Sequence, residues 1–599
     1  MTGGVRSRGG ARPPRSGDAG AGLLAAGVVL AGLLAACSPD AGEDHAADPF
    51  PEAWPFPSDA DAVTAPRGMV VTADSAASAA GLAMLADGGN AVDAAVAAHF
   101  ALAVAYPRAG NLGGGGFLVL RTSGGREAAL DFREEAPAGA TRNMFLGPGG
   151  EVTGESWTGP LASGVPGSVA GMAAAHRRYG SLPWPRLLEP AIRQAEAGFR
   201  VDSAMHRELA EEAGRLRRYP ASAAKWLPGG EPPAPGDRFR QPDLARVLRT
   251  LAERGGEAFY TGWIADSLAA HMRRSGGLID RGDLRAYDAV WREPVTFGYR
   301  GRRVVAMPPP SSGGVTLAEI FRIVEGFRLD TMGFGSPDAL HVAVEAFRRA
   351  FADRNYYLGD PGFVAMPLER LTSRAYADSL RRTIRLDSAS PSGRFTRVPA
   401  RPAESSETTH FSVVDSAGNA VAVTTTLNGY YGSAVTARGT GILMNNEMDD
   451  FTARPGAPNA YGLVQGEANA IAPGKRMLSS MSPTLLVDSA GRTRLATGSP
   501  GGSRIITTVF QVISNTVDFG LGAQGAVNAP RVHHQHLPDT VFYEPGGLPP
   551  GVIAELRRRG HALVERDAYS GNVQSVLIRE DGARVGAVDP RRGGEALGR

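Results

Sequence analysis

Thr408 is the residue in this sequence whose surroundings best suit a chemical role. It stands between a polar stretch, residues 387–407, and a run of strand-forming residues, 409–414. If the chain were cut before Thr408, that residue would carry both a hydroxyl nucleophile and a free α-amine able to accept its proton. Threonines are also common at strand starts without any catalytic role. The residue pattern alone therefore leaves both interpretations open.

Cys37, the only cysteine of the 599 residues, lies in a segment with the pattern of an export signal. Arginines before residue 20 precede an apolar run over 21–36, which is shorter than the roughly 20 residues of a membrane-spanning helix. Leu34-Ala-Ala-Cys37 is similar to a bacterial lipobox, which predicts a lipid-anchored protein that faces the periplasm or is attached to the outer membrane. Ordinary signal cleavage beside an unrelated cysteine is the alternative. A lipidated Cys37 leaves the mature protein no thiol for catalysis or zinc binding.

The composition is that of an ordinary globular protein. Apolar residues make up 43% and charged residues 21% of the chain, which excludes a disordered chain and a polytopic membrane protein. With 63 basic and 61 acidic residues the net charge is +2, so no basic surface for nucleic acid is expected. The 78 glycines and 43 prolines show no collagen-like period and predict many tight turns.

The elements that must position Thr408 alternate between helices and strands. Residues 38–62 are rich in Asp, Ala and Pro and predict an unstructured tether, and 387–407 predict an exposed linker. Glycines within 498–503 would place backbone amides at the start of a helix. Mainly helices are predicted over 74–104, 165–285 and 315–385, and strands at 117–120, 128–133, 409–414, 420–427, 484–487, 493–497 and 573–578. This order predicts a layered α/β sandwich.

Several long segments resemble the γ-glutamyltransferase family, whose members are also called glutathione hydrolases. The similarity covers roughly residues 62–590 in the family's order, and its segments are Asp131-Phe-Arg133, Pro308-Pro-Pro-Ser-Ser-Gly-Gly314, Thr408-Thr-His-Phe-Ser-Val-Val-Asp415, Asn445-Asn-Glu-Met-Asp-Asp-Phe451, Ser479-Ser-Met-Ser-Pro-Thr484 and Thr497-Gly-Ser-Pro-Gly-Gly-Ser-Arg504. The resemblance implies an α/β fold, the αββα sandwich of N-terminal-nucleophile hydrolases. It also implies a precursor that cuts itself between Glu407 and Thr408 into a large subunit, 63–407, and a small subunit, 408–599, which stay together.

The resemblance implies four catalytic residues. Thr408 is the expected nucleophile, and the Thr426 hydroxyl, on the next strand of the predicted hairpin, is expected to orient it. Gly501 and Gly502 are expected to offer backbone N–H groups to the oxyanion of the tetrahedral intermediate. A Gly-Gly pair at a helix start suits that role, because no side chain obstructs it and the helix dipole favours negative charge.

The resemblance also implies how a γ-glutamyl group, which carries a zwitterion, would be held. Its α-carboxylate is expected to bind Arg133, with hydroxyl donors supplied by Ser479 and Ser480. Its α-ammonium is expected to bind three acceptors, namely Asn428, Glu447 and Asp450. Residues 454–469 are similar to the lid loop that some bacterial members carry, and within it Tyr461 is the expected gate and substrate contact.

No cofactor is implied, and a metal is not expected at His533-His-Gln-His536, because Ala529 to Gln535 resembles a stretch of this metal-free family. The leading interpretation is an exported enzyme that cleaves glutathione and other γ-glutamyl amides and passes the acyl group to water or to an amino acid or peptide amine. One alternative is a related acylase that acts on glutaryl or cephalosporin-type substrates. Another is a non-catalytic binding lipoprotein. Glu447 and Asp450 argue against the acylase, because an acyl group without an ammonium would leave two carboxylates unpaired.

Overall fold

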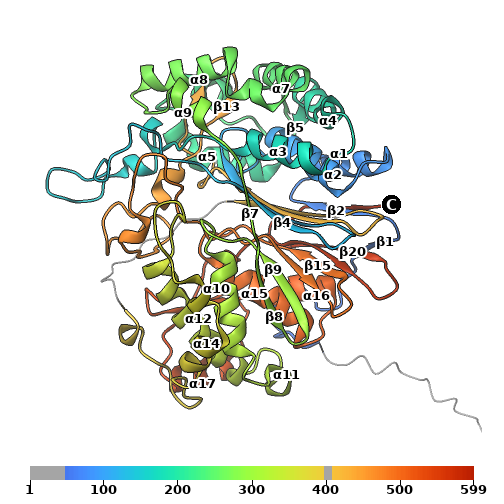
Figure 1. Ribbon diagram of the computed structural model, residues 1–599, viewed down its shortest axis with the longest axis vertical. Helices are drawn as coiled ribbons and strands as arrows, with labels where there is room; N and C mark the ends of the chain where they lie inside the picture. Colours follow the sequence, from blue (N-terminus) through green and yellow to red (C-terminus); the bar gives the residue numbers. More distant parts are fainter. Residues whose placement is uncertain (1–47, 397–407) are drawn as a thin grey trace, which may run out of the picture. The chain divides into compact units, whose positions relative to one another are not determined.

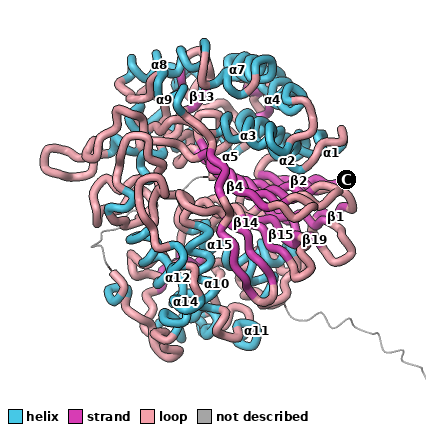
Figure 2. Tube along the Cα trace, viewed as in Figure 1, coloured by secondary structure: helices cyan, strands magenta, loops and turns pink. Residues whose placement is uncertain are grey.

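The computed structural model describes residues 48–396 and 408–599, which belong to one compact unit. The predicted signal segment with Cys37 and the predicted cut after Glu407 lie outside the described residues. Two seven-stranded sheets occupy the middle of the unit, with helices on the outer side of each (Figure 1 and Figure 2). This is the αββα arrangement that the sequence predicts.

The first sheet contains the strand that begins beside Thr408. Its order is β21 (Glu595–Gly598), β2 (Met69–Thr72), β10 (Thr409–Val414), β11 (Ala420–Thr426), β3 (Gly115–Arg121), β4 (Glu127–Phe132) and β7 (Val290–Arg292). Pairing on both sides fixes β10, with Thr409 opposite Thr425 and Val413 opposite Val70. The predicted hairpin of 409–427 is confirmed.

The second sheet stacks on the first. Its order is β1 (Val63–Ala65), β20 (Arg584–Val588), β19 (Gln574–Ile578), β15 (Thr493–Thr497), β14 (Thr484–Val487), β9 (Arg302–Ala306) and β8 (Val295–Tyr299). Three smaller sheets are formed by β5 (Phe199–Arg200) with β6 (Arg238–Phe239), by β12 (Thr436–Ala437) with β13 (Ile442–Leu443), and by β16 (Val532–His533), β17 (Val541–Tyr543) and β18 (Leu563–Glu565). Both large sheets thus combine strands from before and after residue 407.

Helices cover the outer faces of the two sheets. In Figure 1 the upper layer contains α1 (Ser75–Ala86), α2 (Ala91–Ala105), α3 (Ser168–Tyr179), α4 (Trp184–Ala197), α5 (Ser203–Leu216), α7 (Pro242–Arg254), α8 (Gly262–Ser275) and α9 (Arg281–Ala286). The lower layer contains α10 (Gly313–Val324), α11 (Leu329–Met332), α12 (Pro337–Tyr357), α14 (Arg374–Arg381), α15 (Arg504–Val517), α16 (Ala523–Asn528) and α17 (Pro550–Arg558). Two further short helices are α6 (Pro220–Trp226) and α13 (Leu368–Leu371).

The first sheet is buried on both faces, because its side chains alternate between two hydrophobic cores. On β3, Phe117 and Val119 join the core between the sheets, whereas Leu118 and Leu120 join the core under the upper helices. Successive side chains of a strand point to opposite faces, so a strand covered on both sides, such as β3, carries apolar residues at successive positions. Thr408 therefore stands at the end of a rigid central strand.

Residues 48–62 are not the unstructured tether that the composition predicts. Trp54 is buried and donates a hydrogen bond from Nε1 to the backbone oxygen of Asn528 at 2.9 Å. The ring of Phe50 packs on Phe334 with centroids 5.3 Å apart. The aromatic residues within this polar, proline-rich segment bury enough apolar surface to hold it against the protein. Ser392 in the predicted exposed linker is buried as well, so that prediction is wrong for the part near residue 392.

No helix in the described ranges is both long enough and apolar enough to cross a membrane.

Candidate active site

Thr408 lies directly before β10 and is 5% exposed. Its hydroxyl donates to the Thr426 hydroxyl on the neighbouring strand, with the two oxygens 3.4 Å apart. Thr426 Oγ also accepts the backbone N–H of Asn428 at 2.7 Å, which fixes its orientation. The hairpin therefore brings together the two hydroxyls that the sequence analysis paired.

A small cavity of about 20 Å³ lies beside Thr408. It is lined by ten of the predicted site residues, which are Arg133, Thr408, Thr426, Asn428, Glu447, Asp450, Tyr461, Ser479, Ser480 and Gly502. Gly501, the residue before Gly502 in the sequence, does not line the cavity. Arg354, from α12, lines the cavity although the sequence analysis did not select it. Residues from the first sheet, from the loops before β14 and after β15, and from α12 thus meet at one point.

Arg133 and two of the predicted ammonium acceptors contact one another in this structure. Arg133 Nη1 lies 2.5 Å from Glu447 Oε2, and Nη2 is paired with Asp450. Burial and the neighbouring carboxylates raise the pKa of Glu447 well above its usual value, although Arg133 opposes the shift. Burial likewise raises the pKa of Asp450. Two carboxyl groups thus share one guanidinium in a buried place, an arrangement that favours an added cation or a proton.

Glu134 is a third buried carboxylate at this place, and the sequence analysis missed it. It is fully buried beside Arg133, with Nη1 and Oε2 3.5 Å apart, and its oxygens have no hydrogen-bond partner among the described residues. Burial raises its pKa to about 7. Its position next to Arg133 in the sequence was the one available signal.

The predicted serine donors are held by the Pro308–Gly314 loop. Ser479 N donates to Pro310 O at 2.9 Å, and Ser312 Oγ donates to Ser479 O at 2.6 Å. Ser480 Oγ accepts a hydrogen bond from Arg354 Nη2 at 2.9 Å. The role of the Pro308–Gly314 loop is therefore to hold the segment that carries the two serines.

Gly501 and Gly502 precede α15, and the left-handed backbone of Gly502, with φ at 56°, requires glycine. A Cβ at Gly502 would lie 2.4 Å from Cδ1 of the Tyr461 ring. Among the described residues neither glycine's N–H has a backbone acceptor. Two amides at a helix start are therefore available to a developing negative charge.

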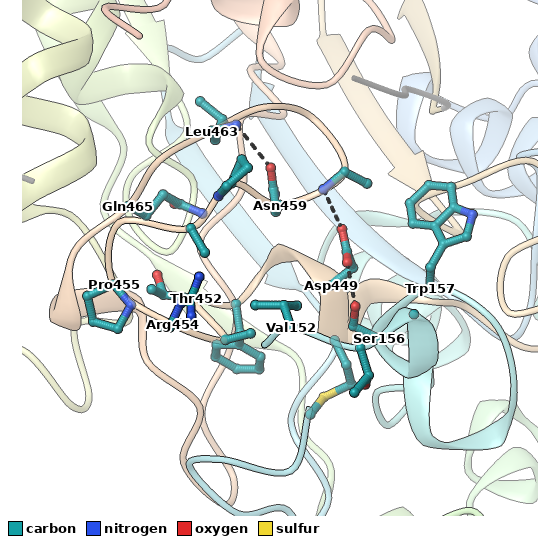
Figure 3. A pocket seen from close by; sticks show the side chains of 18 of the residues that line it. Val152, Ser156, Trp157, Asp449, Thr452, Arg454, Pro455, Asn459, Leu463 and Gln465 are labelled. Carbon is teal, nitrogen blue, oxygen red and sulfur yellow. Dashed lines mark hydrogen bonds between the residues drawn. The ribbon is translucent and has the colours of Figure 1, made fainter. Parts of the chain in front are cut away.

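Tyr461 lines the cavity and is 6% exposed. Its hydroxyl donates to Asn428 O at 2.9 Å and also contacts the Asn428 side chain. The loop of residues 454–469, which carries Tyr461, borders a second, larger cavity of about 690 Å³ (Figure 3). Leu463 lines both cavities.

Asp449 attaches this loop to the opposite wall of the larger cavity (Figure 3). Its carboxylate accepts hydrogen bonds from Ser156 Oγ at 2.7 Å and from Ala460 N at 3.0 Å. Burial raises the pKa of Asp449 to about 6. The attachment of the loop is thus made by a group that titrates near neutral pH.

The histidines of 533–536 have protein neighbours. His533 Nδ1 is 2.8 Å from Thr507 Oγ1, and His534 Nε2 is 3.2 Å from Asp539 Oδ1. Burial lowers the pKa of His534 to about 4. In the described part of the chain no group of three or more His, Cys, Asp or Glu side chains could hold a metal ion.

Comparison with solved structures agrees with the architecture of the N-terminal-nucleophile hydrolases. A cephalosporin acylase from Bacillus halodurans matches with a TM-score of 0.80 and 30% identity, over 92% of this chain and 99% of that chain. A γ-glutamyltranspeptidase from Pseudomonas nitroreducens, complexed with L-DON, matches with a TM-score of 0.52 and 39% identity, over 56% of this chain and 98% of that chain.

Sequence comparison identifies the family. The family model described as gamma-glutamyltranspeptidase matches residues 77–599. A glutathione hydrolase proenzyme of Escherichia coli (strain K12) is 48% identical over 531 residues, which are 88% of this chain and 91% of that protein. An acylase ACY 1 proenzyme of Pseudomonas sp. (strain V22) is 39% identical over 546 residues, 90% of this chain and 95% of that protein. The chain belongs to the γ-glutamyltranspeptidase family.

Proposed function

We propose that this protein is a self-processing γ-glutamyl hydrolase and transferase that cleaves glutathione and other γ-glutamyl amides. The observation that carries the proposal is the lining of the cavity beside Thr408, which combines a hydroxyl nucleophile with groups of both charges. A γ-glutamyl group carries an α-ammonium and an α-carboxylate, and both need buried partners. The similarity to a glutathione hydrolase proenzyme supports the same substrate class.

Catalysis begins after the proposed cut between Glu407 and Thr408. Thr408 Oγ attacks the γ-amide carbonyl carbon, and the new α-amine of Thr408 takes the hydroxyl proton. The C–N bond of the amide then breaks, the proton passes to the leaving amine, and a γ-glutamyl ester remains on Thr408. Water or an amine attacks this ester, which releases glutamate or a new γ-glutamyl amide and restores the Thr408 hydroxyl.

The N–H groups of Gly501 and Gly502 would stabilise the oxyanion of both tetrahedral intermediates. Their place at the start of α15 supports this role, because the helix dipole adds to the two donors. Thr426 Oγ, fixed by the Asn428 N–H, would keep the Thr408 hydroxyl aimed at the carbonyl.

The charged groups would rearrange around the substrate. An entering α-ammonium gives Glu447 and Asp450 a second cation with which to pair. Some N–H groups of the Arg133 guanidinium then become available to the α-carboxylate. Asn428 would supply an uncharged acceptor, and Ser479 and Ser480 two hydroxyl donors. Tyr461, bonded to Asn428, would close the cavity over the bound group.

A related acylase remains the second candidate, because a relative named acylase shares 39% identity with the chain. A glutaryl group lacks the ammonium, so it would leave the buried carboxylates of Glu134, Glu447 and Asp450 with Arg133 as their one directly paired cation among the described residues. A non-catalytic binding lipoprotein would require a chain that is never cut at Thr408.

Hydrolysis of γ-glutamyl anilide beside glutaryl anilide tests the proposal, with Thr408→Ala as the control. We expect faster turnover of the γ-glutamyl substrate, two chain fragments on a denaturing gel with Thr408 at one new N-terminus, and neither fragments nor turnover in the variant. Faster turnover of glutaryl anilide would favour the acylase. A chain that is never cut would favour the binding protein.

We also propose that the protein is exported and anchored through Cys37. The lipobox-like sequence before this cysteine supports the proposal. Metabolic labelling with a radioactive fatty acid should mark the wild type and not Cys37→Ser, and the variant should leave the membrane fraction. Equal labelling of both proteins would contradict lipidation at this residue.

A further inference from the structure

Arg354 is a buried cation of the cavity that the proposed mechanism does not use. It lies near the end of α12 and is 2% exposed. Its guanidinium donates to Ser312 Oγ at 3.0 Å, Asn355 Oδ1 at 2.9 Å, Gln465 Oε1 at 3.3 Å and Ser480 Oγ at 2.9 Å. Each of these acceptors is uncharged. Burial lowers the pKa of Arg354 to about 10, and the charge of Asp450 opposes this shift.

The other buried arginines nearby have their charges matched. Arg348 and Arg349, on the same helix, both pair with Glu345. Arg133, which also lines the cavity, pairs with Glu447 and Asp450. A buried cation whose donors all reach neutral oxygens is costly unless an anion completes it. Because Arg354 lines the cavity, a bound anionic group could supply the missing charge.

The bond to Ser480 determines what that serine can do. A hydroxyl that accepts a hydrogen bond from a guanidinium keeps its own proton to donate elsewhere. Among the described residues Ser480 Oγ has Arg354 as its one hydrogen-bond partner, so the O–H is available to a ligand. Ser479 Oγ likewise accepts the Met481 N–H at 3.1 Å, which leaves its proton available. Two hydroxyl donors thus lie beside a buried cation that forms no direct ion pair among the described residues, although Asp450 acts on it from a longer distance, and together they suit a carboxylate.

Arg354 also links this site to the segment that carries Asp450. Its partner Gln465 donates from Nε2 to Asp450 O at 3.2 Å, and the neighbouring Gly466 N donates to Asn355 O at 2.9 Å. The side chain of Arg354 thus connects Ser480 to the segment that carries the ammonium acceptor Asp450.

We propose that Arg354 is a positioning residue for the α-carboxylate of the γ-glutamyl group, acting by holding Ser480 as a hydroxyl donor and by supplying positive charge behind it. The inference rests on the proposed γ-glutamyl specificity. Arg133 then need not leave its two acids completely when substrate binds.

Steady-state kinetics of Arg354→Gln and Arg354→Lys test the proposal. The substrates are γ-glutamyl anilide and γ-aminobutyryl anilide, which lacks the α-carboxylate. In Arg354→Gln we expect the KM for γ-glutamyl anilide to rise about tenfold to a hundredfold, the range for a lost hydrogen bond to a charged group, with a much smaller change in kcat. The KM for γ-aminobutyryl anilide should change little. Because KM does not depend on the fraction of active molecules, poor folding or incomplete self-cleavage cannot imitate this result.

Arg349→Gln is the matched control, since it removes a buried arginine of the same helix outside the cavity. It should lower the yield and leave both KM values unchanged. If Arg354→Gln gives no cleaved enzyme, the proposal is tested with Arg354→Lys. The single ammonium of lysine cannot bond both Ser312 and Ser480 as the guanidinium does, so the KM of this variant for γ-glutamyl anilide should rise. An unchanged KM, or an equal rise for both substrates, would overturn the proposal. Failure of the wild type to cleave γ-glutamyl anilide would instead refute the proposed function.

Discussion

The hydroxyls of Thr408 and Thr426 lie 3.4 Å apart across adjacent strands of one hairpin, and Thr426 is itself fixed by the Asn428 N–H. Thr426→Val removes that hydroxyl with little change of shape. We expect kcat on γ-glutamyl anilide to fall about 2- to 10-fold, because one hydrogen bond between neutral hydroxyls, of about 0.5–1.5 kcal/mol, is lost. Thr426→Ser keeps the hydroxyl and should retain most of the activity. Equal kcat values for wild type and Thr426→Val would show that Thr426 does not orient the nucleophile.

Gly502→Ala is expected to abolish most activity without unfolding the protein. The new methyl would meet the Tyr461 ring at 2.4 Å, and the left-handed backbone would be strained. Displacing this amide should cost about 10²-fold or more in kcat, as for other oxyanion donors. Gly520→Ala is the control, since Gly520 has φ at 67° but open space around it. Gly520→Ala carries the backbone strain without the clash, so it should lose less thermal stability and keep its activity. A similar loss of activity in both variants would contradict the assignment.

Asp449 predicts a pH-dependent stability. Burial raises its pKa from 3.8 to about 6, so between these values the folded protein holds a proton that the unfolded chain has lost. The stability from this carboxyl is therefore complete below about pH 4 and is lost as the pH rises through about 6. Asp449→Asn does not titrate, so its Tm relative to the wild type should increase from pH 4 to pH 7. A Tm difference between the variant and the wild type that does not change with pH would contradict this prediction.

Trp54→Ala should destabilise the protein although residue 54 lies far from the cavity in sequence. The substitution removes a buried indole and its hydrogen bond to Asn528 O. We expect a loss of about 3–5 kcal/mol in the free energy of unfolding, measured by urea denaturation, with an unchanged KM. Glu52→Ala, at an exposed position of the same segment, should be neutral. A neutral Trp54→Ala would mean that the segment contributes no stability.

Most of the architecture and most of the cavity could be predicted from the sequence. Period-two patterns located β10 and β11, and the family segments located Arg133, Glu447 and Ser480, because each lies in a local motif. Arg354 could not be predicted in this way. It is 126 positions from Ser480 in sequence, and its role depends on which loops α12 meets in space.

Burial of the segment near Trp54 was missed for a related reason. Composition averages a segment, and the average of residues 38–62 is polar, yet a few aromatic side chains are enough to fix a short stretch when a matching surface exists. That surface is built by residues near Asn528, at the other end of the chain.

The shared sheets have a consequence for the lifetime of the cut protein. β2 lies between β21 and β10, so strands from the two proposed fragments are interleaved rather than merely in contact. Before the cut, refolding is a first-order event within one chain. After it, the same sheets can re-form only when two separate chains meet, at a rate that falls with dilution. We therefore expect self-cleavage to make unfolding effectively irreversible. The mature enzyme persists because it unfolds slowly, and the unfolded fragments refold inefficiently.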